Sequence, residues 1–112
     1  MKDKIKLLFV CILNLQRSPT AESLFDNNEK YEAESVGISE LASKKISKSS
    51  VRWADIIFCM EDIHKEFILE KFPKESKGKK IIVLDTPDIY FRNDPELRGI
   101  LAEKLDHWLQ KN

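Results

Sequence analysis

The chain has 112 residues, of which 42% are hydrophobic and 34% are charged, and its formal net charge at pH 7 is zero. This length allows one modest hydrophobic core, so we expect residues 1–112 to form a single domain. The balanced charge gives no general electrostatic basis for binding nucleic acid or an anionic membrane surface. Two cysteines are too few for a disulfide framework and favour a reduced, cytoplasmic protein.

The amino-terminal segment loosely resembles a signal peptide, because lysines precede an apolar run. The run is interrupted by Lys6 and ends at Asn14, however, and no small-residue cleavage site follows it. No stretch reaches the roughly 20 apolar residues that a membrane-spanning helix needs. We therefore expect a protein that is neither exported nor anchored in a membrane.

Apolar runs and segments with helical spacing alternate along the whole chain. The runs typical of buried strands are residues 5–10, 31–36, 54–60 and 81–84. The segments with helical spacing are residues 18–28, 40–50, 62–72 and 95–109. The pattern over residues 40–50 is the weakest, because only Leu41 and Ile46 serve as apolar anchors.

Polar residues and prolines mark where the predicted helices begin. Ser18 is predicted to be the N-cap of the first helix, with Pro19 at its first position. Asp62 is placed to cap the third helix. The last helix has the clearest beginning, because Asp94 precedes Pro95 and an apolar stripe follows. The residues of that stripe are Leu97, Ile100, Leu101, Leu105, Trp108 and Leu109.

This alternation predicts an α/β protein of three layers, with a four-stranded parallel sheet between two layers of helices. In such sheets ligands bind beyond the carboxyl ends of the strands. Four chemically active residues follow strands and are expected at this edge: Cys11, Glu61, Asp62 and Asp88. The lysine-rich segment 74–80 precedes the last strand and is therefore expected at the opposite edge, as a solvated loop.

The connection between the first strand and the first helix has the composition of a phosphate-binding loop. A short loop before a helix gathers backbone N–H groups at a positive helix end, where a tetrahedral anion binds. Cys11 opens this loop as a nucleophile, and Arg17 closes it as a cation able to contact two phosphoryl oxygens at once. The residues predicted to surround the anion are Ile12, Leu13, Asn14, Leu15, Gln16, Arg17 and Ser18.

The positive surroundings of the loop favour the thiolate form of Cys11, which we expect to attack phosphorus. Ser18 is placed to hydrogen-bond that thiolate. Asn14 tolerates the left-handed backbone that such a loop requires, and its side chain can hold the loop by hydrogen bonds.

A phosphatase also needs an acid that protonates the departing oxygen. We predict Asp88 for this role, because it has no helix to cap and lies in a proline-containing loop at the correct edge of the sheet. Asp94 is already explained as a helix cap. Asp85 is a third candidate, but it lies close to the end of the last strand.

The loop resembles the signature of the low-molecular-weight protein tyrosine phosphatases, on the residues Val10-Cys11-x-x-Asn14-x-x-Arg17-Ser18-Pro19-x-Ala21-Glu22. Comparable segments of that family fall at residues 35–37, 54–61 and 86–90. The resemblance is to the short bacterial members. It implies metal-free, two-step hydrolysis through a phosphocysteine, with Asp88 at the family's acid position. Leu13 departs from the family's usual glycine, and Gln16 stands where many members have a second cysteine.

The leading functional prediction is a phosphomonoesterase that acts on phosphotyrosine in proteins or on small aryl phosphates, as a monomer and without a cofactor. A phosphate-binding module without turnover is an alternative that Leu13 favours. A thiol arsenate reductase would need further reactive cysteines, and only Cys59 remains. A phosphate-accepting carrier is a fourth possibility, although Arg17 at this spacing suits phosphoryl hydrolysis better.

Other residues receive predictions from their position in the sequence. Tyr90 is predicted to form a wall for the aromatic ring of the substrate, with attachment of its loop to the core as the alternative. Cys59 is expected to be an inert residue of a buried strand. His64 and His107 have charged neighbours on helices and are expected to be solvated. No spacing typical of metal ligands is present.

Overall fold

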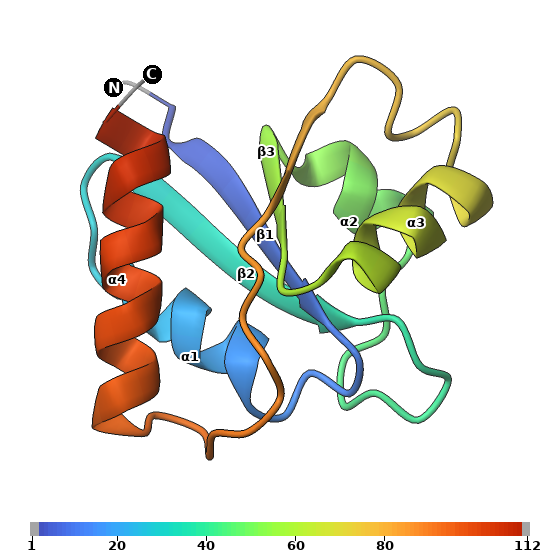
Figure 1. Cartoon of the computed structure of the whole chain (residues 1–112). Helices are drawn as coiled ribbons and strands as arrows, with labels where there is room; N and C mark the ends of the chain where they lie inside the picture. The colour runs from blue at the N-terminus through green and yellow to red at the C-terminus, as the bar shows by residue number, and fades with distance from the viewer. Residues whose placement is uncertain (1–2, 111–112) are drawn as a thin grey trace.

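The computed structural model, which describes residues 3–110, contains one four-stranded sheet in the order β2-β1-β3-β4 (Figure 1). The strands are β1 (Ile5–Cys11), β2 (Tyr31–Gly37), β3 (Ile56–Cys59) and β4 (Lys80–Val83). All neighbouring strands pair in parallel. The helices are α1 (Arg17–Ser23), α2 (Lys48–Trp53), α3 (Asp62–Lys71) and α4 (Pro95–Gln110). None of the helices in this part of the chain is long and apolar enough to cross a membrane.

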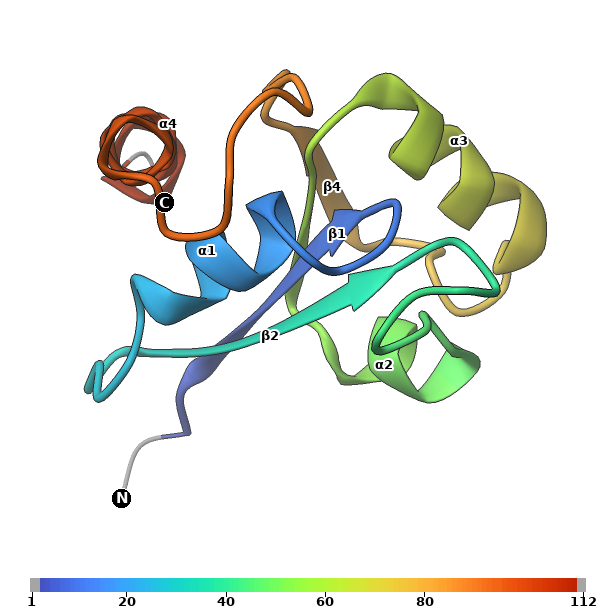
Figure 2. The ribbon, with the colours of Figure 1, turned by 90° about the horizontal axis from the view of Figure 1, so that it is seen from below.

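The helices cover both faces of the sheet, as Figure 2 shows: α1 and α4 lie on one side, and α2 and α3 on the other. Successive side chains of a strand point to opposite faces, and β1 serves both layers in this way. Leu7 and Phe9 pack with the helices α1 and α4, whereas Leu8 and Val10 pack with α2 and α3. The predicted three-layer α/β architecture with a parallel sheet is confirmed.

The helix predicted over residues 40–50 is wrong for its first part. Lys44 and Ile46 instead exchange backbone hydrogen bonds with Gly37 at the end of β2, at 2.8 and 2.9 Å. These strand-like contacts use the backbone groups that a helix would need. The helix α2 begins only after Ser47, whose hydroxyl accepts a hydrogen bond from the Ser50 N–H.

Two of the predicted helix caps are also wrong. Gln16 is the N-cap of α1, and Ser18 lies within that helix. The Ser18 hydroxyl contacts the side chains of Cys11 and Asn14 in the preceding segment instead of capping the helix. Glu61, not Asp62, is the N-cap of α3. The predicted cap of α4 is confirmed, since the carboxylate of Asp94 accepts a hydrogen bond from the Glu96 N–H at 2.8 Å.

The segment after β2 supports the loop between β1 and α1. Ile38 and Ser39 donate backbone hydrogen bonds to Cys11 and Ile12, each at 3.0 Å. A close approach of the two segments is needed at Gly37, where an added Cβ would lie 2.5 Å from the carbonyl oxygen of Ile12 and 2.9 Å from the backbone nitrogen of Asn14. Glycine is therefore required at this position for steric reasons.

We predict that Gly37→Ala lowers the free energy of unfolding by about 1–3 kcal/mol, because the loop must move to admit the methyl group. The matched control is Gly99→Ala in α4, where an added Cβ meets no atom within 4 Å. Alanine there should raise the free energy of unfolding by up to about 1 kcal/mol, because it favours the helix. Urea denaturation of both variants measures the difference; equal effects would contradict the steric explanation.

Candidate active site

The thiol of Cys11 lies at the end of β1, where the sheet edge meets the loop. Its Sγ is 2.8 Å from the hydroxyl oxygen of Ser18 and accepts a hydrogen bond from the Asn14 N–H at 3.3 Å. Asn14 has a φ of +57°, in the left-handed region that asparagine tolerates, as the sequence predicts. The loop thus turns back and directs a backbone N–H and a hydroxyl at the sulfur.

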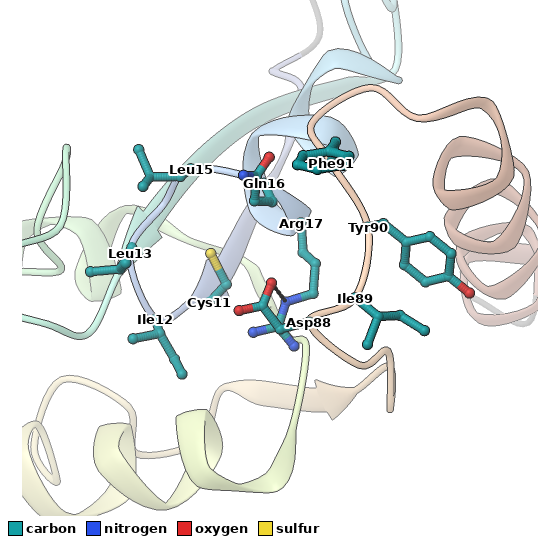
Figure 3. Close-up of a pocket in the computed structure, with 10 residues that line it drawn as sticks. All are labelled: Cys11, Ile12, Leu13, Leu15, Gln16, Arg17, Asp88, Ile89, Tyr90 and Phe91. Atoms are coloured by element: carbon teal, nitrogen blue, oxygen red, sulfur yellow. Dashed lines mark ion pairs between the residues drawn. The ribbon is translucent and has the colours of Figure 1, made fainter.

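Arg17 is the largest of the fully buried side chains, with 1% of its surface exposed. Its Nη1 donates hydrogen bonds to the carboxylate of Glu61 at 2.5 Å and to the carbonyl oxygen of Thr86 at 2.7 Å. Its Nε lies 3.8 Å from the Asp88 carboxylate. The Nη1 end of the guanidinium is therefore held by Glu61 and Thr86. The Nε atom lies on the side where Asp88 borders the pocket (Figure 3).

The three acidic candidates lie in different surroundings. Asp88 borders the same pocket as Cys11, and 57% of its side chain is exposed. Asp94 caps α4 and does not line this pocket. Asp85 is exposed, and its carbonyl oxygen accepts a hydrogen bond from the ammonium group of Lys104. Among these three carboxylates, only that of Asp88 lines the pocket with Cys11 and Arg17.

The pocket has a volume of about 510 Å³ and lies between the loop after β1 and the loop after β4 (Figure 3). Much of its lining is apolar: Ile12, Leu13, Leu15, Ile89 and Phe91, all of them exposed. Tyr90 also borders the pocket, but its ring points away from Cys11 towards α4 and packs against the core. The position of its ring agrees with the alternative that Tyr90 attaches the loop to the core.

Several functional contacts were missed by sequence reasoning. Glu61 was placed at the correct edge but not as a partner of Arg17, and the Thr86 carbonyl gives no sequence signal because every residue has one. Ser35 and Glu22 extend the hydrogen bonds of the loop into α1 and β2. The signals for this part of the site were the segment of residues 35–37 and Glu22 at the end of the family signature.

The prediction that His64 is solvated is wrong. His64 lies on α3 and is completely buried, and its Nδ1 accepts a hydrogen bond from the Glu61 N–H at 3.0 Å. Burial lowers the pKa of His64 to about 4, and the nearby charge of Arg17 acts in the same direction. A neutral imidazole therefore fixes the backbone of the residue that pairs with Arg17. His107 is exposed, as predicted.

The second cysteine, Cys59, is buried in β3, and burial raises the pKa of its thiol to about 12. This agrees with the prediction of an inert strand residue. Residues 3–110 contain no group of three or more histidine, cysteine, aspartate or glutamate side chains that could hold a metal ion.

Comparison with known proteins finds a relative by sequence and several solved structures by fold. No family model matches the chain. The protein-arginine-phosphatase of Geobacillus stearothermophilus is 31% identical over 98 residues, and the match covers 66% of this chain and 66% of that protein. The chain thus matches just under two thirds of that relative's length.

Solved structures share the fold at lower identity. The YwlE arginine phosphatase from Geobacillus stearothermophilus superimposes with a TM-score of 0.69 at 24% identity, covering 96% of this chain and 94% of that one. SP-PTP, a low molecular weight protein tyrosine phosphatase from Streptococcus pyogenes, gives a TM-score of 0.77 at 21% identity, covering 96% and 92%. Wzb from Vibrio vulnificus, in complex with benzylphosphonate, gives 0.76 at 21% identity, covering 98% and 100%.

The chain combines a parallel α/β sheet with a cysteine at the end of β1 and a buried arginine at the start of α1. The solved structures above share the fold of this chain. The chain is thus similar in sequence, over part of its length, to a protein-arginine-phosphatase, and similar in fold to low molecular weight protein tyrosine phosphatases.

The burial of His64 predicts a pH dependence of stability. Because its pKa is about 4 when folded and about 6.5 when unfolded, the unfolded chain binds more protons between these values. The contribution of His64 to stability is therefore complete above pH 6.5 and is lost as the pH falls towards 4. In His64→Gln, the decrease in the free energy of unfolding from pH 7 to 4.5 should be smaller by roughly 2–3 kcal/mol than in the wild type.

Urea denaturation at several pH values measures this effect. The exposed His107 provides the control, because His107→Gln should leave the decrease unchanged. An equal decrease in His64→Gln and the wild type would show that the imidazole titrates alike in both states.

Proposed function

We propose that this protein is a phosphomonoesterase that hydrolyses aryl phosphates, with phosphotyrosine in proteins as the substrate class, through a phosphocysteine at Cys11. The observation that carries this proposal is the position of the Cys11 sulfur. It borders the pocket with Arg17 and Asp88, and it contacts the Ser18 hydroxyl and the Asn14 N–H. The proposed reaction uses this sulfur as the nucleophile.

In the first step the Cys11 thiolate attacks phosphorus, so that an S–P bond forms while the P–O bond to the leaving group breaks. Asp88 gives its proton to the departing oxygen. Arg17 contacts the phosphoryl oxygens, whose charge it stabilises in the transition state. The loop residues 12–18 surround the phosphoryl group with their backbone N–H groups and the Ser18 hydroxyl.

In the second step a water molecule attacks the phosphocysteine. Asp88, now ionised, removes a proton from this water as an O–P bond forms. The S–P bond breaks, which returns the thiolate of Cys11 and releases inorganic phosphate. Asp88 is thus protonated again, and the cycle closes without a metal ion or a redox step.

The walls of the pocket support an aryl substrate. Large apolar side chains from both loops would contact an aromatic ring attached to the phosphate, and burial of their surface would add binding energy. Leu13 adds to this apolar wall. Tyr90 also borders the pocket, and we propose that this part of the residue contributes to the wall, although its ring points away from Cys11.

Phosphoarginine is a second candidate substrate. The relative from Geobacillus stearothermophilus is a protein-arginine-phosphatase, and the exposed carboxylate of Asp88 could pair with a guanidinium group. An arsenate reductase is less well supported, because the remaining thiol of Cys59 is buried and its raised pKa keeps it protonated.

We further propose that the protein works as a single-domain monomer in the cytoplasm. Both cysteines are free thiols, and the reaction needs Cys11 in its reduced form. A reducing compartment maintains that state.

We predict that Cys11→Ser lowers kcat for p-nitrophenyl phosphate by more than about a thousandfold, because serine lacks a comparable nucleophile. The variant should remain folded and still bind vanadate. Cys59→Ala is the matched control and should keep most of the activity. The measurement is hydrolysis in the presence of a chelator. Substantial activity of the serine variant would exclude covalent catalysis by cysteine, and binding without turnover in the wild type would favour the binding module.

We predict that Asp88→Asn lowers kcat for phenyl phosphate by about 10²–10⁴-fold, because this leaving group needs a proton. The loss for p-nitrophenyl phosphate should be under about tenfold, since its leaving group departs as an anion. Asp94→Asn is the control, because asparagine also caps helices well. If Asp94→Asn showed the leaving-group-dependent loss instead, the acid would be wrongly assigned.

Substrate class is tested with two peptides of one sequence, phosphorylated on tyrosine in one and on arginine in the other. We predict a kcat/KM at least about tenfold higher for phosphotyrosine, because the apolar walls favour an aromatic ring over a charged guanidinium. Release of inorganic phosphate measures both reactions. A preference for the phosphoarginine peptide would assign the protein to the second candidate function.

A further inference from the structure

A chain of hydrogen bonds connects Cys11 with a carboxylate outside the pocket. Cys11 Sγ lies 2.8 Å from Ser18 Oγ. The amide nitrogen Nδ2 of Asn14 donates both to Ser18 Oγ at 3.0 Å and to Ser35 Oγ at 2.8 Å. Ser35 Oγ donates in turn to Glu22 Oε1 at 2.5 Å. Glu22 lies on α1 and does not line the catalytic pocket.

The chemistry of these groups determines which of them donates and which accepts in each hydrogen bond of the series. An ionised carboxylate can only accept, so Glu22 takes the single hydroxyl hydrogen of Ser35. The oxygen of Ser35 must then accept from the Asn14 amide, which requires the NH₂ group on that side. Ser43 does not contribute to this orientation, because the backbone carbonyl oxygen of Asn14, at 2.9 Å, is a closer acceptor for its single hydroxyl hydrogen than Asn14 Oδ1 at 3.2 Å.

The same reasoning determines the direction of the hydrogen bond between Ser18 and Cys11. The Asn14 NH₂ group also donates to Ser18 Oγ, so the oxygen of Ser18 is used as an acceptor on that side. Its single hydrogen is left for Cys11 Sγ at 2.8 Å or for the Val36 carbonyl at 3.4 Å. The shorter contact is the one with sulfur, and a negatively charged sulfur is the stronger acceptor.

We propose that Glu22 is a positioning residue for the nucleophile. Its carboxylate orients Ser35, Asn14 and Ser18 in series, so that the Ser18 hydroxyl donates to the Cys11 thiolate. The two serines, Asn14 and Cys11 are each at most 6% exposed, so bulk water does not compete for their hydrogen bonds.

Loss of the charge of Glu22 would remove the requirement that the Ser35 hydroxyl donate to this carboxylate. The Ser35 hydroxyl could then donate towards Asn14, whose amide could turn its oxygen to both serines. Ser18 would donate to that oxygen rather than to sulfur, and the thiolate would lose a hydrogen bond that favours it. This deepens the proposed function at the same site and rests on that function only for its activity readout.

The test is the pH dependence of alkylation of Cys11 by iodoacetamide, followed by mass spectrometry, in wild type and Glu22→Gln. We expect the midpoint to move up by about one pH unit, and kcat/KM for p-nitrophenyl phosphate to fall by up to about tenfold at pH values below both midpoints. The charged groups at this site, Arg17 from α1, Asp88 from the loop after β4 and Glu61 before α3, are the same in both proteins. Glu66→Gln, on the exposed surface of α3, is the matched control and should leave the midpoint unchanged.

A second variant, Ser35→Ala, removes one link of the hydrogen-bond series and leaves Glu22 in place. It should move the midpoint of Cys11 alkylation in the same direction as Glu22→Gln. The decisive comparison repeats Glu22→Gln in a Ser18→Ala background, where it should have no further effect on the midpoint. Thermal unfolding checks that each variant is folded.

An unchanged midpoint in both Glu22→Gln and Ser35→Ala would overturn the proposal, as would a shift that persists without the Ser18 hydroxyl. Alkylation needs no substrate, so these outcomes are separate from a failure of the phosphatase activity itself.

Discussion

The buried guanidinium of Arg17 imposes the condition that the rest of the site meets. A charge in the interior is costly unless it is paired and hydrogen-bonded. Its partners Glu61 and Thr86 follow β3 and β4, while Arg17 itself follows β1. All three connections meet at the carboxyl edge of one parallel sheet. The cation can therefore be accommodated only when these strands are aligned, and the position of Arg17 is coupled to the fold.

A second set of contacts holds the loop from the side of β2. The backbone of residues 38–43 donates hydrogen bonds to the carbonyl groups of Cys11, Ile12 and Leu13. Gly37 allows the two segments to approach, since any side chain would collide with the loop. The loop is thus supported before a substrate arrives. Such preorganisation makes electrostatic stabilisation of a transition state effective, because the donors need not be rearranged during the reaction.

Patterns with a local cause were predicted well. The strands were recognised because burial on both faces of a parallel sheet requires continuous apolar runs. Asp94 was recognised as a cap because it precedes Pro95 and needs no distant partner. The helix expected over residues 40–50 failed for the opposite reason. Lys44 and Ile46 bond to Gly37 at the end of β2, and residues 40–50 carry no local signal for this pairing with a strand elsewhere in the chain.

The sequence by itself determined the class of fold and the central chemistry. Alternating runs dictate the layers, and Cys11 and Arg17 occupy one short loop, so their proximity follows from covalent connection. Only the tertiary structure decided which distant groups serve them. Glu61 was one of several acidic residues at the expected edge, and His64 seemed solvated because its neighbours along the chain are charged. Contacts between distant segments depend on how the strands and helices pack, and spacing along the chain carries little information about that packing.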